Sequence, residues 1–171
     1  MATLTITVSK AAVVEAIKGD TYITSSVDRG ADSVKNAGVA YNEAAGDDQH
    51  HEKKIDRMIK GAMSKFAAEL SEFVDTGSGG SISATIANSN IVITMTVTSR
   101  YQQGLAGPLS GIAQDYIVNM SLYGWWMSIK PELAKNFAAL AQDALIYVRK
   151  CFAKTAPTAT GDPTSATGVV S

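Results

Sequence analysis

Two adjacent histidines are the residues of this chain best suited to chemistry. His50 and His51 follow Asp47 and Asp48 and precede Glu52, and imidazole together with carboxylate oxygens can bind zinc or nickel. Neighbouring residues on a helix point about 100° apart, however, whereas metal-binding histidine pairs usually stand four residues apart. The chain has no third histidine and a single cysteine to complete a shell. We therefore predict a solvated first turn of a helix here, with no metal and no cofactor.

Three other patterns have a simpler structural explanation than a catalytic one. Cys151 lies on an apolar helical stripe, far in sequence from both histidines, so we interpret it as a core residue and not as a nucleophile. The glycine-rich run 77–80 lacks the lysine of a phosphate-binding loop and predicts a flexible joint. Trp125 and Trp126 lack the interleaved basic residues of a base-stacking platform, which favours the core or a protein interface. The sequence thus predicts no catalytic residue and no enzyme.

Composition limits the partners of the chain. With 171 residues, 46% of them hydrophobic, it can bury one core of respectable size. Fifteen Lys and Arg against sixteen Asp and Glu leave no basic field to hold DNA or an anionic membrane by charge. No apolar run approaches the roughly 18 residues of a membrane span, and the start of the chain does not resemble a secretory signal. One cysteine excludes an intrachain disulfide and fits assembly in a reducing cytoplasm.

Two amphipathic helices dominate the pattern. The first begins at Asp47 or Asp48, whose carboxylates suit the positive end of a helix dipole, and it ends before the glycine-rich run. The second starts at Pro131, where the missing N–H costs nothing, after a loop over 100–108 and a helical stretch from Leu109. Apolar residues spaced by three and four form the predicted core. Its principal members are Ile55, Ile59, Phe66, Leu70, Phe137, Leu140, Leu145 and Val148.

Alternating polar and apolar residues predict strands in two places. Near the N-terminus the alternation with threonine is typical of a half-buried strand, or of an arm that adds to another sheet. A hairpin is expected over 81–99, and it must pack on the helices or pair with another chain, because two strands alone are marginally stable. From these patterns and the tryptophan pair we predict a subunit or partner interface. It comprises Leu4, Ile6, Val8, Ile82, Ile86, Ile91, Ile93, Trp125 and Trp126.

The predicted fold class is mainly α with an inserted β-hairpin (α+β), a helical bundle with extended N-terminal and C-terminal arms. Residues 1–154 form one domain, in which 1–46 supply the N-terminal arm and short helices. The first of these helices follows an N-cap at Ser9 and closes at Gly19, and 20–46 form a partly helical connection. Residues 155–171, rich in Thr, Ala, Pro, Gly and Ser, predict a flexible tail.

The order of elements resembles the head-to-tail connector, or neck adaptor, proteins of tailed bacteriophages. The resemblance covers residues 47–152: an acidic start and amphipathic helix through Ile55-Asp-Arg-Met-Ile59, a hairpin, and Pro131-Glu-Leu-Ala leading to Ala144-Leu-Ile-Tyr147. It is a match of element order and helical pattern, without a fixed motif. The first 46 residues are longer than the usual lead-in of that family, and the tail is not part of its pattern.

The resemblance implies a virion structural protein without enzymatic activity. We expect a homo-oligomeric ring, typically of about twelve copies in that family, located in the neck between portal and tail and assembled in the host cytoplasm. Its partners would be the portal protein and tail or second neck-ring proteins, with DNA as passing cargo and no membrane. Two alternatives stay open: a tail-completion or tail-terminator protein, and a small metal-dependent enzyme that uses His50 and His51.

Overall fold

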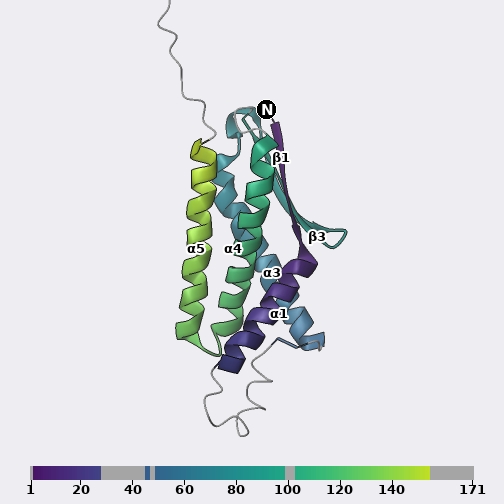
Figure 1. The fold of residues 1–171 in the computed structure, drawn as a ribbon. Helices are drawn as coiled ribbons and strands as arrows, with labels where there is room; N and C mark the ends of the chain where they lie inside the picture. Colours follow the sequence, from purple (N-terminus) through teal and green to yellow (C-terminus); the bar gives the residue numbers. More distant parts are fainter. Residues whose placement is uncertain (1, 28–44, 47–48, 99–102, 155–171) are drawn as a thin grey trace, which may run out of the picture.

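The computed structural model describes residues 2–27, 45–46, 49–98 and 103–154. Within these ranges a bundle of α-helices covers one face of a small antiparallel sheet (Figure 1), which confirms the predicted α+β class. The elements in chain order are β1 Ala2–Ser9, α1 Lys10–Val27, α3 Gln49–Leu70, β2 Ile82–Ala87, β3 Asn90–Val97, α4 Ala106–Trp126 and α5 Pro131–Lys154. Short 3-10 turns occupy Ser71–Phe73, Thr76–Ser78 and Gln103–Leu105.

Helix α4 is the centre of the bundle. It contacts α5 on one side and α3, α1 and β1 on the others, and Figure 1 shows it between α5 and the rest of the molecule. Its buried side chains therefore lie around most of the helix circumference instead of forming one stripe. Helix α5 packs mainly against α4 and is the outer helix of the bundle.

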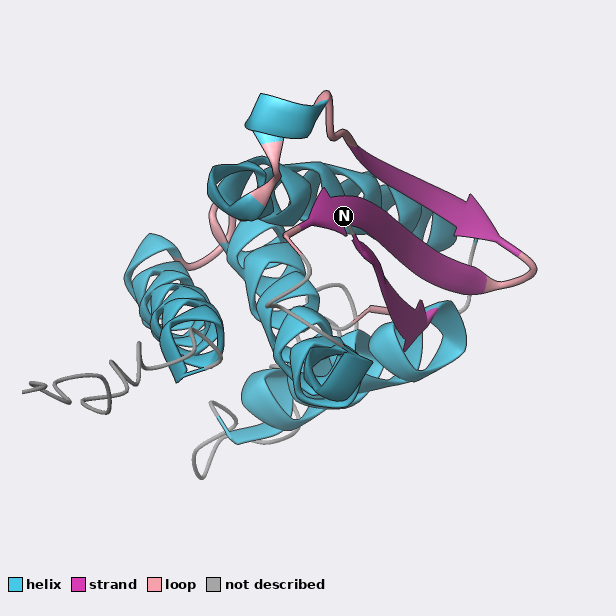
Figure 2. Ribbon diagram, turned by 90° about the horizontal axis from the view of Figure 1, so that it is seen from above, coloured by secondary structure: helices cyan, strands magenta, loops and turns pink. Residues whose placement is uncertain are grey.

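The sheet has the order β1-β3-β2, with β3 in the middle and both neighbours antiparallel to it (Figure 2). The register places apolar side chains of the three strands in rows on the inner face, such as Ile6 beside Ile93 beside Ala84. The outer face carries mainly threonine, for example Thr5 beside Thr94. One face thus belongs to the core and the other to solvent, as expected of a small antiparallel sheet.

A two-residue type I′ turn connects the two strands of the hairpin. Asn88 and Ser89 have φ of 49° and 62°, the left-handed values that a two-residue type I′ turn requires. Before the hairpin, Gly80 must lack a side chain, because a Cβ would stand 2.6 Å from the carbonyl oxygen of Asp75. The Gly80 N–H donates a hydrogen bond to that same oxygen at 2.9 Å, which closes the loop, and the Asp75 N–H donates to the Thr96 carbonyl at 3.0 Å, which holds the loop against β3.

Helix α1 differs from the prediction at its end. Ser9 caps it as expected, since its hydroxyl accepts the Ala12 N–H at 3.3 Å, but the helix runs through Gly19 to Val27. Thr21, fully buried, explains the continuation: its hydroxyl donates to the Lys18 carbonyl and accepts the Ala45 N–H, both at 3.0 Å. These contacts outweigh the cost of about 1 kcal/mol for a glycine within a helix.

Two other boundaries also shift. Helix α3 is described from Gln49, and the predicted start at residues 47–48 lies outside the described residues. Helix α4 begins at Ala106 instead of Leu109, so that Pro108 stands in the first turn, where its missing N–H leaves no helix hydrogen bond broken. The predicted tail over 155–171 also lies outside the described residues.

Most residues predicted to form a partner interface lie in the chain's own core. This differs from the prediction because β1 pairs with β3 of the same chain, so that helices of this chain cover the inner face of the sheet. Ile82 and Ile86 on the edge strand β2 remain half-buried. Seven residues are at most 3% exposed: Leu4, Ile6, Val8, Ile91, Ile93, Trp125 and Trp126.

The residues predicted as core are mostly buried, with one clear departure. Leu140 is 51% exposed, and Phe137 is half-buried. The buried row of α5 that packs against α4 includes Ala141 and Val148, and Leu140 lies beside this row. The other predicted core residues are buried: Ile55, Ile59, Phe66, Leu70, Leu145 and Val148.

Candidate functional site

The two histidines of the predicted helix start have different surroundings. The Nδ1 atom of His51 accepts the Gly46 N–H at 2.8 Å, and its ring meets the Trp125 ring edge-on at a centroid distance of 5.2 Å. His50, one residue earlier, is exposed. In the described part of the chain no three residues of the types His, Cys, Asp and Glu are grouped to hold a metal ion. His51 therefore links the segment before α3 to the bundle.

Replacing His51 by alanine is expected to lower the free energy of unfolding by about 1 to 2 kcal/mol, because the partly buried Gly46 N–H loses its acceptor and Trp125 loses an aromatic neighbour. Urea denaturation followed by circular dichroism measures this loss. His50→Ala is the matched control, since the His50 side chain is exposed, and we expect a smaller effect. A larger loss in His50→Ala, or a rise in stability of the unmodified chain on adding Zn²⁺, would contradict this assignment.

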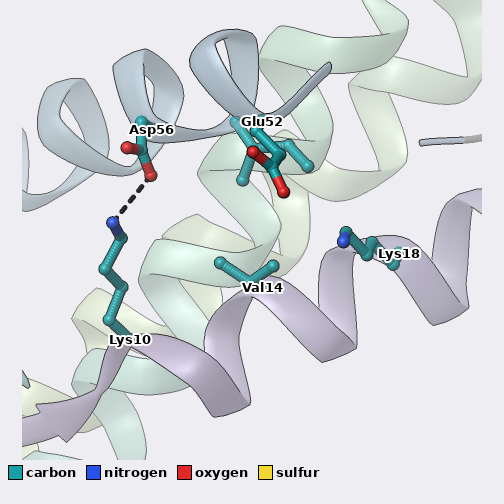
Figure 3. A pocket seen from close by; sticks show the side chains of 6 residues that line it. Lys10, Val14, Lys18, Glu52 and Asp56 are labelled. Atoms are coloured by element: carbon teal, nitrogen blue, oxygen red, sulfur yellow. Dashed lines mark ion pairs between the residues drawn. The ribbon is translucent and has the colours of Figure 1, made fainter. Parts of the chain in front are cut away.

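A shallow hollow of about 280 Å³ lies between α1 and α3. Figure 3 shows lysines from α1 on one side and carboxylates from α3 on the other. The Lys10 Nζ atom lies 2.9 Å from Asp56 Oδ1. The Lys10 and Asp56 side chains are 27% and 46% exposed, so solvent screens the pair and it contributes no more than about 1 kcal/mol. The described residues that line the hollow are Lys10, Val14, Lys18, Glu52, Ile55 and Asp56.

This hollow has the composition of a helix contact. Two lysines face two carboxylates, which leaves little net charge to attract an anion or a cation. The ionisable groups of its described lining are lysine amines and carboxylates, with no thiol, hydroxyl or imidazole beside them. We therefore interpret the Lys10–Asp56 pair as a surface ion pair that connects α1 to α3.

The tryptophan pair is a structural centre. Trp125 and Trp126 at the end of α4 are at most 1% exposed, so neither ring face is available for stacking on a base or sugar. Lys54 places Nζ 4.0 Å from the Trp125 ring centre, and Lys130 places Nζ 5.4 Å from the Trp126 ring centre, which are cation–π contacts. Burial beside Trp125 lowers the pKa of Lys54, because desolvation disfavours its charged form. Both rings thus fasten α4 to its neighbours.

One flank of α5 carries apolar side chains that the fold covers only in part. Leu140 and Tyr147 are 51% and 58% exposed, and with half-buried Leu133 and Phe137 they stand four, three and seven residues apart along one side of the helix. We call these four residues the α5 stripe. Ile146, 47% exposed, points to another side. Leu140 and Tyr147 are thus exposed large apolar residues on one line of a helix, which is the arrangement that a protein contact would use.

The α5 stripe was missed from the sequence because Leu140 fits the three-and-four spacing of the core. A signal was present: Leu133, Phe137, Leu140 and Tyr147 form a second apolar line beside the line that faces α4. An outer helix needs a single buried line, so a second one indicates a further contact.

No family model, curated protein or solved structure matches this chain. None of the helices in the described ranges is both long and apolar enough to cross a lipid bilayer.

Proposed function

We propose that this chain is a structural protein of a tailed-bacteriophage virion, a subunit of the neck ring between portal and tail. The element order that carries the resemblance is present as α3, the β2–β3 hairpin, α4, and α5 beginning at Pro131. The observation that supports an assembly role best is the α5 stripe, which lies on the outer helix and not around a cavity. Exposed apolar lines of this kind are typical of protein contacts.

A cyclic ring needs two unlike surfaces, since each subunit contacts the next head to tail. We assign the α5 stripe to one of these two surfaces. The role expected for an N-terminal arm is not retained, because β1 already pairs within its own chain. One of the two ring surfaces on this proposal is thus a helix side.

Charge is compatible with a ring through which DNA passes. The chain carries a formal net charge of −1, so its surface as a whole does not hold phosphates. A strongly basic channel would bind the DNA backbone and slow its passage. Near-neutrality therefore fits DNA as cargo better than DNA as a ligand.

The test locates the protein in the virion and perturbs the α5 stripe. Gold-labelled antibody against the chain, viewed on virions by negative-stain electron microscopy, is expected to mark the head-to-tail junction. Label along the tail tube or over the capsid would contradict the neck assignment, and label at the far end of the tail would favour a tail-completion role.

The matched variants are Leu140→Asp with Tyr147→Asp, and Ile146→Asp as control. All three side chains are about half exposed in the folded chain, so each variant is expected to fold. The double variant is expected to abolish incorporation into virions, because a charge pair would enter an apolar contact, whereas the control is expected to incorporate normally. Normal incorporation of the double variant would remove the α5 stripe from the proposal.

A further inference from the structure

The two edge strands of the sheet, β1 and β2, differ in whether their outward backbone groups have partners. On β1, the Thr7 N–H donates to the hydroxyl of Ser110 on α4 at 3.3 Å, and α4 and α1 lie beside the strand. On β2, the outermost strand of Figure 2, helix α3 contacts the strand, but no described strand pairs with the side that faces away from β3. An open edge of this kind presents backbone donors and acceptors to any strand that can reach it.

The register shows which backbone groups the β2 edge presents. Ala87 and Asn90 close the two-residue turn as a hydrogen-bonded pair, and further along the ladder the Thr96 N–H donates to the Ser81 carbonyl at 2.9 Å. Because alternate residues of an antiparallel strand face opposite partners, the N–H and C=O groups of Ile82, Ala84 and Ile86 point outward. Three consecutive outward residues are enough for a short strand pair.

Strand β2 also lacks the features that usually block edge pairing. Its sequence Ile-Ser-Ala-Thr-Ile-Ala contains no charged residue and no proline, and its register with β3 is continuous, without a bulge. Natural edge strands that must stay unpaired commonly carry a lysine, a proline or a bulge. The β2 edge is therefore suited to accept a partner strand.

The side-chain pattern of β2 is symmetric about Ala84. Residues 82–86 read Ile-Ser-Ala-Thr-Ile, so an antiparallel copy centred on Ala84 brings Ile82 opposite Ile86 and Ser83 opposite Thr85. In the same register the outward groups of the two strands face each other and make about six hydrogen bonds. The isoleucines then meet on the inner face, where they are half-buried, and the hydroxyls meet on the outer face.

We propose that β2 pairs with β2 of a second copy across a two-fold axis through Ala84, joining two sheets into one continuous sheet. The second copy is the occupant because the pattern is complementary to itself in the register that the outward groups require. A two-fold contact uses the same surface on both partners. This contact is therefore separate from the head-to-tail contact of a ring. The proposal of a β2 pair does not depend on the neck assignment.

The test measures solution mass by sedimentation equilibrium on the full chain and charge variants. The unmodified chain is expected to approach twice its 17.9 kDa mass as concentration rises. Ser83→Lys with Thr85→Lys is expected to give the mass of one chain, because the introduced lysines oppose each other across the axis. Ser83→Lys with Thr85→Glu is expected to restore the dimer, because each lysine then faces a glutamate of the other copy.

The control carries the same charge change on the other edge strand. Thr3→Lys with Thr5→Lys places two lysines on the exposed face of β1 and is expected to leave the mass unchanged. Circular dichroism verifies that all variants fold. A monomeric unmodified chain, a dimer that survives both lysines on β2, or a dimer lost equally in the β1 control would each overturn the proposal.

A cross-link tests the register. Residues directly opposite in a hydrogen-bonded antiparallel pair have Cα atoms about 5.5 Å apart, a distance that a disulfide spans. Ala84→Cys in a Cys151→Ser background is therefore expected to form a disulfide-linked dimer under mild oxidation, and Thr5→Cys in the same background is not. Equal cross-linking of the two variants, or none at Ala84, would contradict the axis position.

Discussion

Replacing Leu4, Ile6 and Val8 together by alanine is expected to unfold the chain at room temperature. All three side chains are at most 3% exposed on the inner face of β1. Truncating a buried leucine or isoleucine to alanine costs about 2 to 5 kcal/mol, and a whole domain is stable by about 5 to 15 kcal/mol. The combined loss thus approaches or exceeds the total. Urea denaturation monitored by far-ultraviolet circular dichroism measures it.

The control uses the alternate residues of the same strand. Thr3, Thr5 and Thr7 point to the exposed face, so replacing all three by alanine is expected to cost about 1 to 2 kcal/mol through lost strand propensity. If the triple core variant has the same free energy of unfolding as the threonine control and loses only its ability to assemble, β1 is an arm for another subunit. The pairing with β3 would then be incidental.

Trp126→Ala is expected to destabilise the chain by about 3 to 5 kcal/mol, the range for deleting a fully buried large aromatic side chain. Trp126 is 0% exposed at the junction of α4 and α5, and its carbonyl accepts the N–H groups of Ile129 and Lys130 at 2.9 and 2.7 Å. The cavity would lie where one helix ends and the next begins. Thermal and urea unfolding measure the loss, with Met127→Ala as the control, because Met127 is 49% exposed.

Trp126→Phe separates packing from polarity. The Trp126 Nε1 atom is buried without a hydrogen-bond partner among the described residues, and an unsatisfied buried donor costs about 1 to 3 kcal/mol. Phenylalanine removes this donor and keeps most of the ring, so its stability is expected to lie much closer to that of the unmodified chain. A loss as large as that of alanine would indicate that the indole N–H is satisfied.

The strands of the sheet were predictable, but their partners were not. Period-two alternation identifies Ile6 and Ile93 as inward residues of strands, since it depends on backbone geometry that acts over a few residues. Which strand pairs with which depends on the whole bundle, and β1 and β3 stand far apart in the sequence. For the same reason Gly19 was expected to end α1, although distant contacts of Thr21 continue the helix.

For the candidate sites as well, local features were predictable from the sequence and contacts between distant elements were not. The sequence predicted correctly that His50 and His51 begin a helix, because capping and spacing are local. It did not reveal the Lys10–Asp56 ion pair, which depends on how α1 crosses α3. It also placed Leu140 in the core, since helical spacing gives the direction of a side chain but not whether a neighbour covers it.

The central position of β3 has a consequence for how the chain forms during synthesis. Strand β1 leaves the ribosome well before its partner strand, which is completed only at Val97. At about 5 to 20 residues per second, β1 waits on the order of ten seconds with an apolar face uncovered. The β2–β3 hairpin closes in microseconds once it is made, so docking of the waiting strand onto it is the late, non-local step of folding.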